Sequence, residues 1–362
     1  MLNVLGLMSG TSMDGVDAAI LVTDGETIAG HGPRLFRPYG EDERKVLRQA
    51  LAEARSLADR DARPGPLAEA ERIVTGAHAE AVEKLLAENP GAEVDLVGFH
   101  GQTVFHAPES RLTVQIGDGQ ALARRVGHRV AYDFRAADVA AGGQGAPFVP
   151  VYHRALAAAA GLAGDTVVVN IGGVANLTRI GNDASLRAGD TGPGNALIDD
   201  FVRARTGTAM DKGGKHASTG RVDEDALAAL LSNGFFDAPF PKSLDRDAFS
   251  LGPVVRLTVA DGAATLAAFT ARSIAKGVAL AGGADRIVVA GGGAHNPVIL
   301  AMLAEAAAVP VTTAADLGWS VDFLEAEAFA FLAARSLAGL PLSYPGTTGV
   351  PRPMPGGVIA DP

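Results

Sequence analysis

The stretch GLMSGTSMDGVD, residues 6–17, decides how the fold is interpreted. It connects an apolar run over 2–7 with residues 16–23, in which apolar side chains recur at every second position. Both patterns predict short strands. A strand, a tight polar turn and a second strand make a hairpin, whereas a dinucleotide-binding fold has a helix after its glycine-rich loop. The chain is therefore predicted to open with a β-hairpin.

The turn of this hairpin has the composition of a phosphate-binding loop. Gly10 and Gly15 allow the backbone to turn tightly and to approach a ligand. The hydroxyl groups of Ser9, Thr11 and Ser12 and the backbone N–H groups of the turn suit phosphate oxygens. Asp14 could order a magnesium ion through water. A plain polar turn is the alternative. Because six of the seven residues from Ser9 to Gly15 are glycine, hydroxylated or acidic, we favour a ligand-binding turn.

The same pattern starts again in the second half of the chain. Residues 166–171 and 174–180 predict two strands joined by Gly172-Gly173. Two halves that each open with a glycine-tipped hairpin indicate an internal duplication, and hence a two-lobed α/β protein with a cleft for ligands. The remaining predictions are helices over 41–90 (broken near 64–66), 195–206, 223–233, 265–281 and 323–338, strands over 94–99, 112–116, 129–132 and 286–290, and an irregular tail from 341.

Length and composition set further limits. The chain has 362 residues, and because a single core stops growing at about 250–300 residues, we expect two domains. A formal net charge of −10, with no Lys/Arg cluster, argues against nucleic-acid binding. The absence of cysteine excludes disulfides and thiolate nucleophiles. Because the N-terminus is not a signal peptide and no apolar run reaches the length of a membrane span, we expect a cytoplasmic protein.

Two further glycine-containing segments precede predicted helices. Asp190-Thr191-Gly192-Pro193-Gly194-Asn195 predicts a rigid, exposed loop that could present Asp190 as a general base. Helix capping by Asp or Thr is the alternative. Gly291-Gly292-Gly293 lies between a strand and a helix, where three glycines would let a base or ribose lie against the backbone. A plain turn needs fewer glycines, so we favour a nucleotide contact there.

Side chains suited to a sugar follow other predicted strands. His100, Gln102 and Thr103 predict a loop that binds sugar hydroxyl groups, although a lone histidine in such a place is more often structural. Arg135 has the planar fork that suits a carboxylate. A surface ion pair explains Arg135 equally well. Asp138 is the other candidate substrate ligand of that segment.

Acidic residues open the last predicted helix. Asp322 and Glu325 have the spacing of an N-cap and its partner, and capping is the interpretation that this spacing favours. Glu325 and Glu327 point to nearly opposite faces of a helix, so at most one of them enters a cleft. We keep Glu325 as a candidate ligand of the substrate and, with Asp14, of magnesium.

In this order the segments resemble the 1,6-anhydro-N-acetylmuramic acid kinase family, which belongs to the superfamily of hexokinases, actin and the heat-shock chaperone ATPases. The resemblance covers nearly the whole chain. Its most specific pieces are residues 6–17, 99–103, 130–150, 170–176, 190–195, 241–249 and 291–296. It implies an α/β fold of two actin-like domains with a central cleft. The expected domains are 1–140, joined by the tail 339–362, and 141–338.

The resemblance also implies a specific reaction. ATP would phosphorylate O6 of the anhydro sugar while water opens the 1,6-anhydro bond, giving N-acetylmuramic acid 6-phosphate and ADP in the recycling of peptidoglycan. Asp190 matches the catalytic base of the family, and residues 10–17 match its ATP loop. We expect Mg²⁺ to accompany ATP. The expected ATP-binding residues are Gly10, Thr11, Ser12, Met13, Asp14, Gly15, Val16, Asp17, Gly172, Gly173, Gly192, Gly291, Gly292 and Gly293.

Two other functions stay open at this point. Close relatives act on levoglucosan, which lacks the N-acetyl and lactyl groups. Arg135 discriminates between these substrates, since a lactyl carboxylate needs a cation. An ATP-gated binding protein on the same scaffold would need a peptide-binding domain, and only a short Pro/Gly tail follows residue 340. The expected partners are a small sugar and ATP, with no nucleic acid and no membrane, and a homodimer is the candidate assembly.

Overall fold

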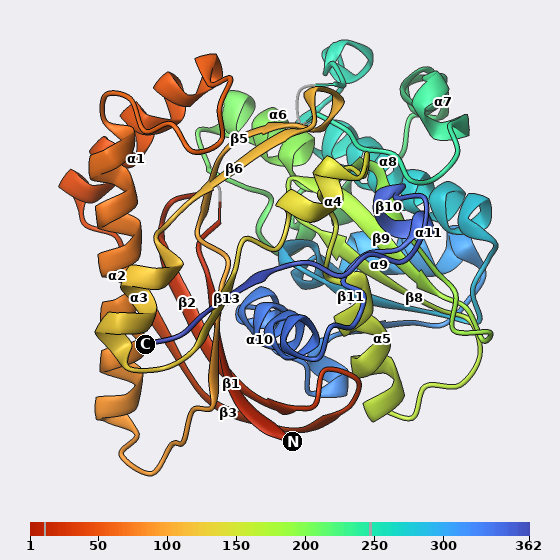
Figure 1. Cartoon of the computed structure of the whole chain (residues 1–362). Coiled ribbons are helices and arrows are strands. Elements are labelled where there is room, and N and C mark those ends of the chain that lie inside the picture. The colour runs from red at the N-terminus through yellow and green to blue at the C-terminus, as the bar shows by residue number, and fades with distance from the viewer. Residues whose placement is uncertain (11, 246–247) are drawn as a thin grey trace. The chain divides into compact units, whose positions relative to one another are not determined.

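The structure is a computed structural model that describes residues 1–10, 12–245 and 248–362 (Figure 1). Its internal contacts divide the chain into two compact units, one made of Met1–Ala159 with Asp322–Pro362 and the other of Ala160–Val321. The sequence places the boundaries near 140 and 338 instead. The difference assigns α5 (Pro150–Ala159) and α10 (Leu324–Leu337) to the first unit.

The first unit is built on a mixed sheet with the strand order β13-β7-β4-β1-β2-β3. The hairpin strands β1 and β2 pair antiparallel from Leu2↔Thr23 to Met8↔Asp17, and β2 pairs antiparallel with β3. By contrast, β1 pairs parallel with β4, and β4 parallel with β7. The strands of this unit are β1 (Leu2–Met8), β2 (Gly15–Thr23), β3 (Ile28–Pro38), β4 (Leu96–Phe99), β5 (Gln102–Ala107), β6 (Leu112–Ile116), β7 (Val130–Tyr132) and β13 (Val358–Ala360).

The helices of the first unit include α10, which packs closely on this sheet. A Cβ atom at Gly6 of β1 would lie 1.9 Å from the Ala326 carbonyl oxygen, and one at Gly98 of β4 would lie 2.3 Å from that of Phe329. Only glycine permits this approach, so the packing ties α10 to the N-terminal sheet (Figure 1). The other helices of the unit are α1 (Glu41–Glu53), α2 (Leu67–Glu88), α3 (Gly119–Val126), α4 (Ala136–Ala140), α5 and α11 (Pro345–Thr348).

The alternation of β1 explains how one strand serves two layers. Leu5 and Leu7 are fully buried in a core with residues of α2, including Val74 and Leu85. Gly6 lies between them, so its Cα faces the opposite side of the sheet, where α10 packs. The apolar run read from the sequence is therefore a strand covered on both faces.

The second unit contains a sheet with the order β10-β9-β8-β11-β12. Its hairpin strands β8 and β9 pair antiparallel, β9 pairs antiparallel with β10, and β8 pairs parallel with β11, which pairs parallel with β12. The elements of this unit are β8 (Thr166–Ile171), β9 (Val174–Ile180), β10 (Leu186–Pro193), β11 (Arg286–Ala290), β12 (Val311–Thr313), α6 (Ala196–Thr206), α7 (Glu224–Leu231), α8 (Val259–Ala281) and α9 (Pro297–Ala307).

Both sheets repeat one topology. Each has an antiparallel meander of three strands, β1-β2-β3 or β8-β9-β10, whose first strand is continued by two parallel strands, β4-β7 or β11-β12. This shared order confirms the duplication that the glycine-tipped hairpins predict. It also confirms the expected α/β fold class, with two units whose sheets have the same strand order.

Most predicted elements are confirmed, and their ends have local causes. The predicted helix over 41–90 is broken as expected, with α1 ending at Glu53 and α2 beginning at Leu67. The helix predicted from 265 begins earlier, at Val259, because the Thr258 side chain accepts a hydrogen bond from the Asp261 backbone N–H and caps it. Among the described residues, no helix is both long and apolar enough to cross a membrane.

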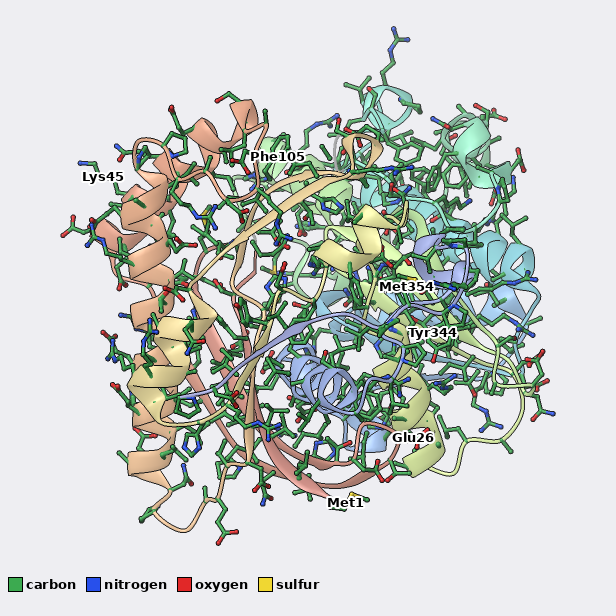
Figure 2. The ribbon with its side chains drawn as sticks, viewed as in Figure 1. Met1, Glu26, Lys45, Phe105, Tyr344 and Met354 are labelled. Atoms are coloured by element: carbon green, nitrogen blue, oxygen red, sulfur yellow. The ribbon has the colours of Figure 1, made fainter. Side chains whose placement is uncertain are left out.

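The prediction of an irregular tail is wrong in part. β13 adds an antiparallel strand to β7, and Ser343 and Met354 form an antiparallel bridge. Arg335 of α10 is 3% exposed and holds the tail by donating to the Pro341 carbonyl and to the Tyr344 hydroxyl. Tyr344 and Met354 are labelled on this segment in Figure 2. A three-residue edge strand is too short to produce a readable pattern.

Candidate active site

The turn of the first hairpin is fixed by buried polar side chains. Ser9 and Gln102 are each 1% exposed, and the Ser9 hydroxyl donates to Gln102 Oε1 at 2.6 Å. Gln102 Nε2 in turn donates to the Gly10 carbonyl at 3.1 Å. The Met13 N–H donates to the same carbonyl, also at 3.1 Å. Gln102 therefore holds the turn from β5, and the predicted ligand Thr11 lies outside the described residues.

The predicted ATP-binding residues of this turn differ in what they can offer a ligand. Among the described residues, a Cβ atom at Gly10 would meet only the Ser12 hydroxyl, at 3.7 Å, so the backbone there is open toward them. Ser12 donates to Asp14 Oδ1 at 2.7 Å, and both side chains are exposed. Met13 and Val16 lie in the hydrophobic core, so only their backbone groups are available. Gly15 is needed for packing, since a Cβ atom there would lie 2.4 Å from the Arg37 carbonyl oxygen.

A pocket of about 290 Å³ lies beside this turn and brings the predicted sugar-binding residues together. Thr103 Oγ1 accepts a hydrogen bond from Gln115 at 3.3 Å, and both ring nitrogens of His106 are bonded within the protein, to Thr113 and to the Gln144 carbonyl. His106 therefore has a structural role, although its side chain lines the pocket. The lining residues are Met8, Ser9, Gly10, His100, Gln102, Thr103, His106, Arg135 and Ala146.

His100 and Arg135 are bonded to each other. Nδ1 of His100 is 2.8 Å from the Gly101 carbonyl oxygen, which places the proton on Nδ1. Nε2 is then an acceptor for the Nε and NH2 groups of Arg135, at 3.2 and 3.1 Å. Burial, followed by the charge of Arg135, lowers the pKa of His100 well below its ordinary value, so His100 is neutral.

Arg135 keeps its charge and part of its donor capacity. Burial lowers its pKa to about 10, so the guanidinium is still protonated at neutral pH. Its third hydrogen bond goes from NH1 to the Gly145 carbonyl at 2.6 Å. Within the described part of the chain, these bonds use three of the five N–H groups of an arginine and leave two for a ligand in the pocket. A planar cation of this kind suits a carboxylate.

Asp138 lies behind the pocket and supports a loop. It is 1% exposed, and its Oδ1 accepts from the Gly145 N–H at 2.7 Å while its Oδ2 accepts from the Thr348 hydroxyl at 2.6 Å. With both oxygens occupied, a direct contact with substrate would require the loop around Gly145 to move. The same loop supplies the carbonyl that orients Arg135, so Asp138 acts on the pocket through that loop.

Glu325 does not have the capping role that its spacing favours. α10 begins at Leu324, its N-cap is Phe323, and no side chain caps it, so Asp322 lies one residue too early. The Glu325 residue keeps exposed surface, yet burial of its carboxyl raises its pKa. The charge of Arg135 acts in the opposite direction and lowers it. Glu327 points elsewhere: it is 1% exposed and is bonded to His31, Arg34 and Tyr152.

Several carboxylates of the first unit influence one another near the hairpin. Burial, followed by the charges of Asp14, Glu325 and Asp322, raises the pKa of Asp17 to about 7. Such mutual repulsion is relieved by a cation. Among the described residues, no three acidic or histidine side chains are arranged to hold a metal directly. A cation held by these carboxylates would have to keep most of its waters, as Mg²⁺ does in proteins.

Three glycine-containing loops of the second unit meet at the carboxyl end of β8. The Gly194 N–H donates to the Gly173 carbonyl at 2.9 Å, and the Asn195 N–H donates to the Gly172 carbonyl at 2.7 Å. A Cβ atom at Gly291 would lie 2.3 Å from Asn170 Oδ1. The second hairpin turn, the start of α6 and the end of β11 are therefore packed together. The ends of parallel strands are where α/β sheets bind ligands.

The glycines of these loops are required for different reasons. Gly293 packs on β8, since its Cβ would lie 2.3 Å from Ile171 Cγ2. Of the residues that the structure describes, a Cβ atom at Gly292 would meet only Asn195, at Nδ2 and 3.5 Å, so Gly292 is the open member of the triplet. Gly192 packs on α8, where its Cβ would lie 2.6 Å from Ser273 Oγ. Within the triplet, Gly292 is thus the member whose backbone a ligand can approach. Among the described residues, Gly172 and Gly173 are similarly open, since a Cβ atom at either would have its nearest neighbour at 3.6 Å.

Asp190 lies in a strand, so the prediction of an exposed loop there is wrong. It belongs to β10 and pairs with Asn176 of β9, and Thr191 forms a bulge before Gly192. Two glycines and a proline interrupt the alternation of apolar residues that identifies a strand in a sequence. A bulge lets the strand contain them. Asp190 itself is partly buried.

Two hydrogen bonds fix Asp190. Its backbone N–H donates to the Lys242 carbonyl at 2.8 Å, and its Oδ2 accepts from the Leu244 N–H at 2.7 Å. Among the described residues, its Oδ1 accepts no hydrogen bond. Burial raises the pKa of Asp190 to about 6, although the Leu244 N–H acts in the opposite direction. A carboxylate with this pKa, one oxygen of which accepts no hydrogen bond from the described residues, can accept a proton near neutral pH.

Sequence reasoning missed the residues that hold these groups in place. The sequence predicts Ser9 as a phosphate ligand, but its side chain is buried and bonded to Gln102 and Tyr39. Segment 240–244 overlaps residues 241–249, a piece of the family resemblance to which the sequence assigns no role, and it supplies both hydrogen bonds to Asp190. The one available signal was the Phe-Pro-Lys-Ser-Leu sequence itself, which has no helix or strand period.

Comparison with known proteins gives one consistent family. The family model described as anhydro-N-acetylmuramic acid kinase matches residues 2–361. The chain is 57% identical over 366 aligned residues to proteins named anhydro-N-acetylmuramic acid kinase from Nitrobacter winogradskyi and from Bradyrhizobium diazoefficiens, and each match covers 100% of both chains.

Solved structures match more distantly. Component A of the (R)-2-hydroxyglutaryl-CoA dehydratase of Acidaminococcus fermentans has a TM-score of 0.45 and 13% identity, over 93% of this chain and 100% of its own. The ROK family glucokinase from Streptomyces griseus, in complex with glucose and AMPPNP, has a TM-score of 0.38 and 14% identity, over 91% of this chain and 97% of its own.

Proposed function

Because the chain belongs to the anhydro-N-acetylmuramic acid kinase family, we propose that it is an ATP-dependent kinase for 1,6-anhydro-N-acetylmuramic acid. The reaction consumes the anhydro sugar, ATP and water and yields N-acetylmuramic acid 6-phosphate, ADP and a proton. The observation that carries this proposal is the family match over residues 2–361. The arrangement around Asp190 supports the chemistry.

Asp190 is the proposed general base. A water bound to its carboxylate attacks the anomeric carbon and gives its proton to Asp190, while the C1–O6 bond breaks. The electron pair of that bond passes to O6, which attacks the γ-phosphorus of ATP as the bond to ADP breaks. The partly buried position and the pKa of about 6 support this role, since the carboxylate is ionised yet basic at neutral pH. Direct attack by water resembles the inverting glycosidases.

The nucleotide is held by backbone groups. The open backbone at Gly10 and at Gly292, and the hairpin turn Gly172-Gly173, are the proposed contacts to ATP. When bound, Mg²⁺ would neutralise charge on the phosphates, with Asp14 and Glu325 as its proposed ligands through water. Asp17 would then ionise at a lower pH, because the cation offsets the neighbouring negative charges.

Arg135 is the proposed ligand of the lactyl carboxylate. Its guanidinium lines the pocket of about 290 Å³, is charged, and has N–H groups left for a ligand. Thr103 lines the same pocket. His100 orients Arg135, and Gln102 holds the hairpin turn through the Gly10 carbonyl. A cation placed in this way favours an acidic sugar over levoglucosan, which has no carboxylate.

The decisive experiment measures ADP release with a panel of sugars. We expect turnover with 1,6-anhydro-N-acetylmuramic acid, at least tenfold less with levoglucosan, and ¹⁸O from labelled water at C1 of the product. Arg135→Ala should reduce kcat/KM for the acidic sugar much more than for levoglucosan. Equal losses on both sugars would remove Arg135 from substrate recognition, and label retained only in the solvent would contradict attack by water.

A role in peptidoglycan recycling, in the cytoplasm, follows from this substrate. A strain that lacks the protein should accumulate the anhydro sugar, and the complemented strain should not. The homodimer stays a prediction, which sedimentation of the purified protein tests directly. A single species at the mass of one chain, 36.8 kDa, would contradict it.

A further inference from the structure

We infer that Lys242 is a positioning residue for Asp190: it anchors segment 240–244, whose backbone holds and aims the Asp190 carboxylate. The inference rests on the proposed role of Asp190. It assigns a function to a lysine whose side chain is bonded to Phe235 and not to Asp190, and to a segment with no regular secondary structure.

The first step of the argument is the double contact between segment 240–244 and Asp190. The Lys242 carbonyl accepts from the Asp190 N–H at 2.8 Å, and the Leu244 N–H donates to Asp190 Oδ2 at 2.7 Å. One bond fixes the backbone of Asp190 and the other fixes its side chain. Because both partners lie on one short segment, any shift of that segment turns the carboxylate.

The second step is what holds the segment itself. The Lys242 ammonium donates to the Phe235 carbonyl at 2.8 Å, and it lies 4.4 Å from the ring centre of Phe235 and 5.1 Å from that of Phe240. A charge-assisted hydrogen bond and two cation–π contacts make a strong anchor for one side chain. The backbone of Lys242 thus contacts Asp190 while its side chain is fixed on Phe235, which is the geometry of a support and not of a proton donor.

The third step is the close fit of the segment on β10. A Cβ atom at Gly189, next to Asp190, would lie 2.8 Å from the Lys242 carbonyl oxygen and 2.8 Å from Cδ1 of Phe240. Gly189 also has a φ of 155°, which side chains rarely adopt. Glycine at this position is therefore what lets the segment lie against the strand that carries the base.

Two other charged groups face Lys242 and must be separated from its anchoring role. Lys276 of α8 forms an ion pair of 2.8 Å with Asp237, and both influence the charge of Lys242. Neither touches segment 240–244 through a hydrogen bond among the described residues. Lys276→Met is therefore the matched control, because it removes a nearby positive charge without removing the anchor.

The experiment compares Lys242→Met, Lys242→Arg and Lys276→Met with wild type in the full chain. Methionine keeps the apolar stem of lysine but loses the ammonium. The pKa of Asp190 is followed by ¹³C NMR of labelled aspartate carboxyls, with Asp190→Asn to assign the signal. Exchange of the Leu244 amide hydrogen and the steady-state kinetics are measured on the same samples.

For Lys242→Met we expect the pKa of Asp190 to rise by about one unit, because the Leu244 N–H no longer favours its charged form. The Leu244 amide should exchange about tenfold faster, and kcat should fall about tenfold with little change in KM for ATP. Lys242→Arg should restore most of these values, since arginine also donates and stacks on aromatic rings. Lys276→Met should match wild type.

An unchanged pKa of Asp190 and unchanged Leu244 exchange in folded Lys242→Met would overturn the inference. Equal effects of Lys276→Met would also overturn it, because charge and not anchoring would then be the cause. If Lys242→Met does not fold, Gly189→Ala provides the second probe and should produce the same rise in pKa. The NMR measurement does not depend on turnover, so it tests the positioning role of Lys242 by itself. Full activity of Asp190→Asn would refute Asp190 as the base, whereas the pKa of Asp190 in Lys242→Met would still show whether Lys242 positions it.

Discussion

The guanidinium of Arg135 donates two hydrogen bonds to Nε2 of His100, at 3.1 and 3.2 Å, while Nδ1 of the same ring is bonded to the Gly101 carbonyl. The ring is thereby held in one neutral tautomer, and its free lone pair fixes the arginine. A protonated His100 would have no lone pair for Arg135 and would repel it. The low pKa of His100 thus serves the orientation of the arginine.

We expect His100→Phe to weaken binding of the acidic sugar. Phenylalanine keeps the ring that packs on Phe329, 4.5 Å away between ring centres, but it cannot accept from Arg135. Loss of a hydrogen bond to a charged group costs about 1.5–3 kcal/mol, so KM for the anhydromuramyl sugar should rise about tenfold or more. His100→Gln, whose amide oxygen can accept, should recover part of the loss. A KM that is equal in wild type and His100→Phe would show that Arg135 needs no such support.

The glycine triplet gives a second prediction, which separates packing from ligand binding. Gly293→Ala should destabilise the protein by about 1–3 kcal/mol, because its Cβ would lie 2.3 Å from Ile171 Cγ2. Gly292→Ala should leave the free energy of unfolding nearly unchanged, since Asn195 is the one described residue within 4 Å of its Cβ, and it should weaken ATP binding. Urea unfolding and calorimetry with an ATP analogue measure both effects. Unchanged affinity in Gly292→Ala would remove this residue from the nucleotide site.

Sequence patterns predict the parts of this fold that are set by neighbouring residues. Both hairpins were readable because a run of apolar residues ends in a glycine-containing turn, and the duplication followed from seeing that pattern twice. β10 was missed because Gly189, Gly192 and Pro193 obscure its alternation. Its pairing with β9 and the bulge at Thr191 make it a strand, and these depend on contacts that no local window contains.

The candidate site was predictable as a set of residue types but not as a set of roles. Asp190 and Leu244 are 54 residues apart, so no spacing rule could connect them. The polarity of Asp138 and Gln102 predicts substrate ligands, but both side chains are buried and support loops. The helix start at Leu324 also removed the capping role of Glu325, because a shift of one residue changes which side chain can reach the helix N-terminus.

Asp17 supplies a third prediction, on the effect of a cation. Its pKa of about 7 arises from burial and then from the charges of Asp14, Glu325 and Asp322. Glu325→Gln should lower the pKa of Asp17, because it removes one of the repelling charges. Mg²⁺ added with an ATP analogue should lower it further in wild type, and less in Glu325→Gln if Glu325 helps to hold the ion. Carboxyl ¹³C NMR measures these shifts, and no response to Mg²⁺ would contradict a metal site beside Asp17.

The fourth prediction concerns chemistry. Asp190→Asn keeps the shape of the side chain and an oxygen that can accept from Leu244, but it cannot take a proton from water. General-base catalysis contributes about 10²–10⁴-fold, and here the same transfer also frees O6 to attack the phosphate, so kcat should fall to the lower end of what can be measured. Calorimetric affinity for both substrates should change little, since the lost interaction belongs to the transition state. A variant with more than about a tenth of wild-type kcat would exclude Asp190 as an essential base, and Glu325 would be tested next.

The fifth prediction concerns the effect of the Asp190 carboxyl on the pH dependence of stability. The pKa of Asp190 is raised from 3.8 to about 6 in the folded protein, so the folded state binds the proton more tightly than the unfolded state does. This group therefore lowers stability as pH rises from about 4 to about 6, and its full cost, about 3 kcal/mol, is present above that range. Asp190→Asn lacks the charge and should escape the cost. Measured by urea unfolding, the variant should gain stability relative to wild type between pH 4 and pH 7.5 by up to this amount. A stability difference that is constant across the range would mean that Asp190 ionises in the folded protein as it does in the unfolded chain, and the physical basis for its role as a base at neutral pH would be lost.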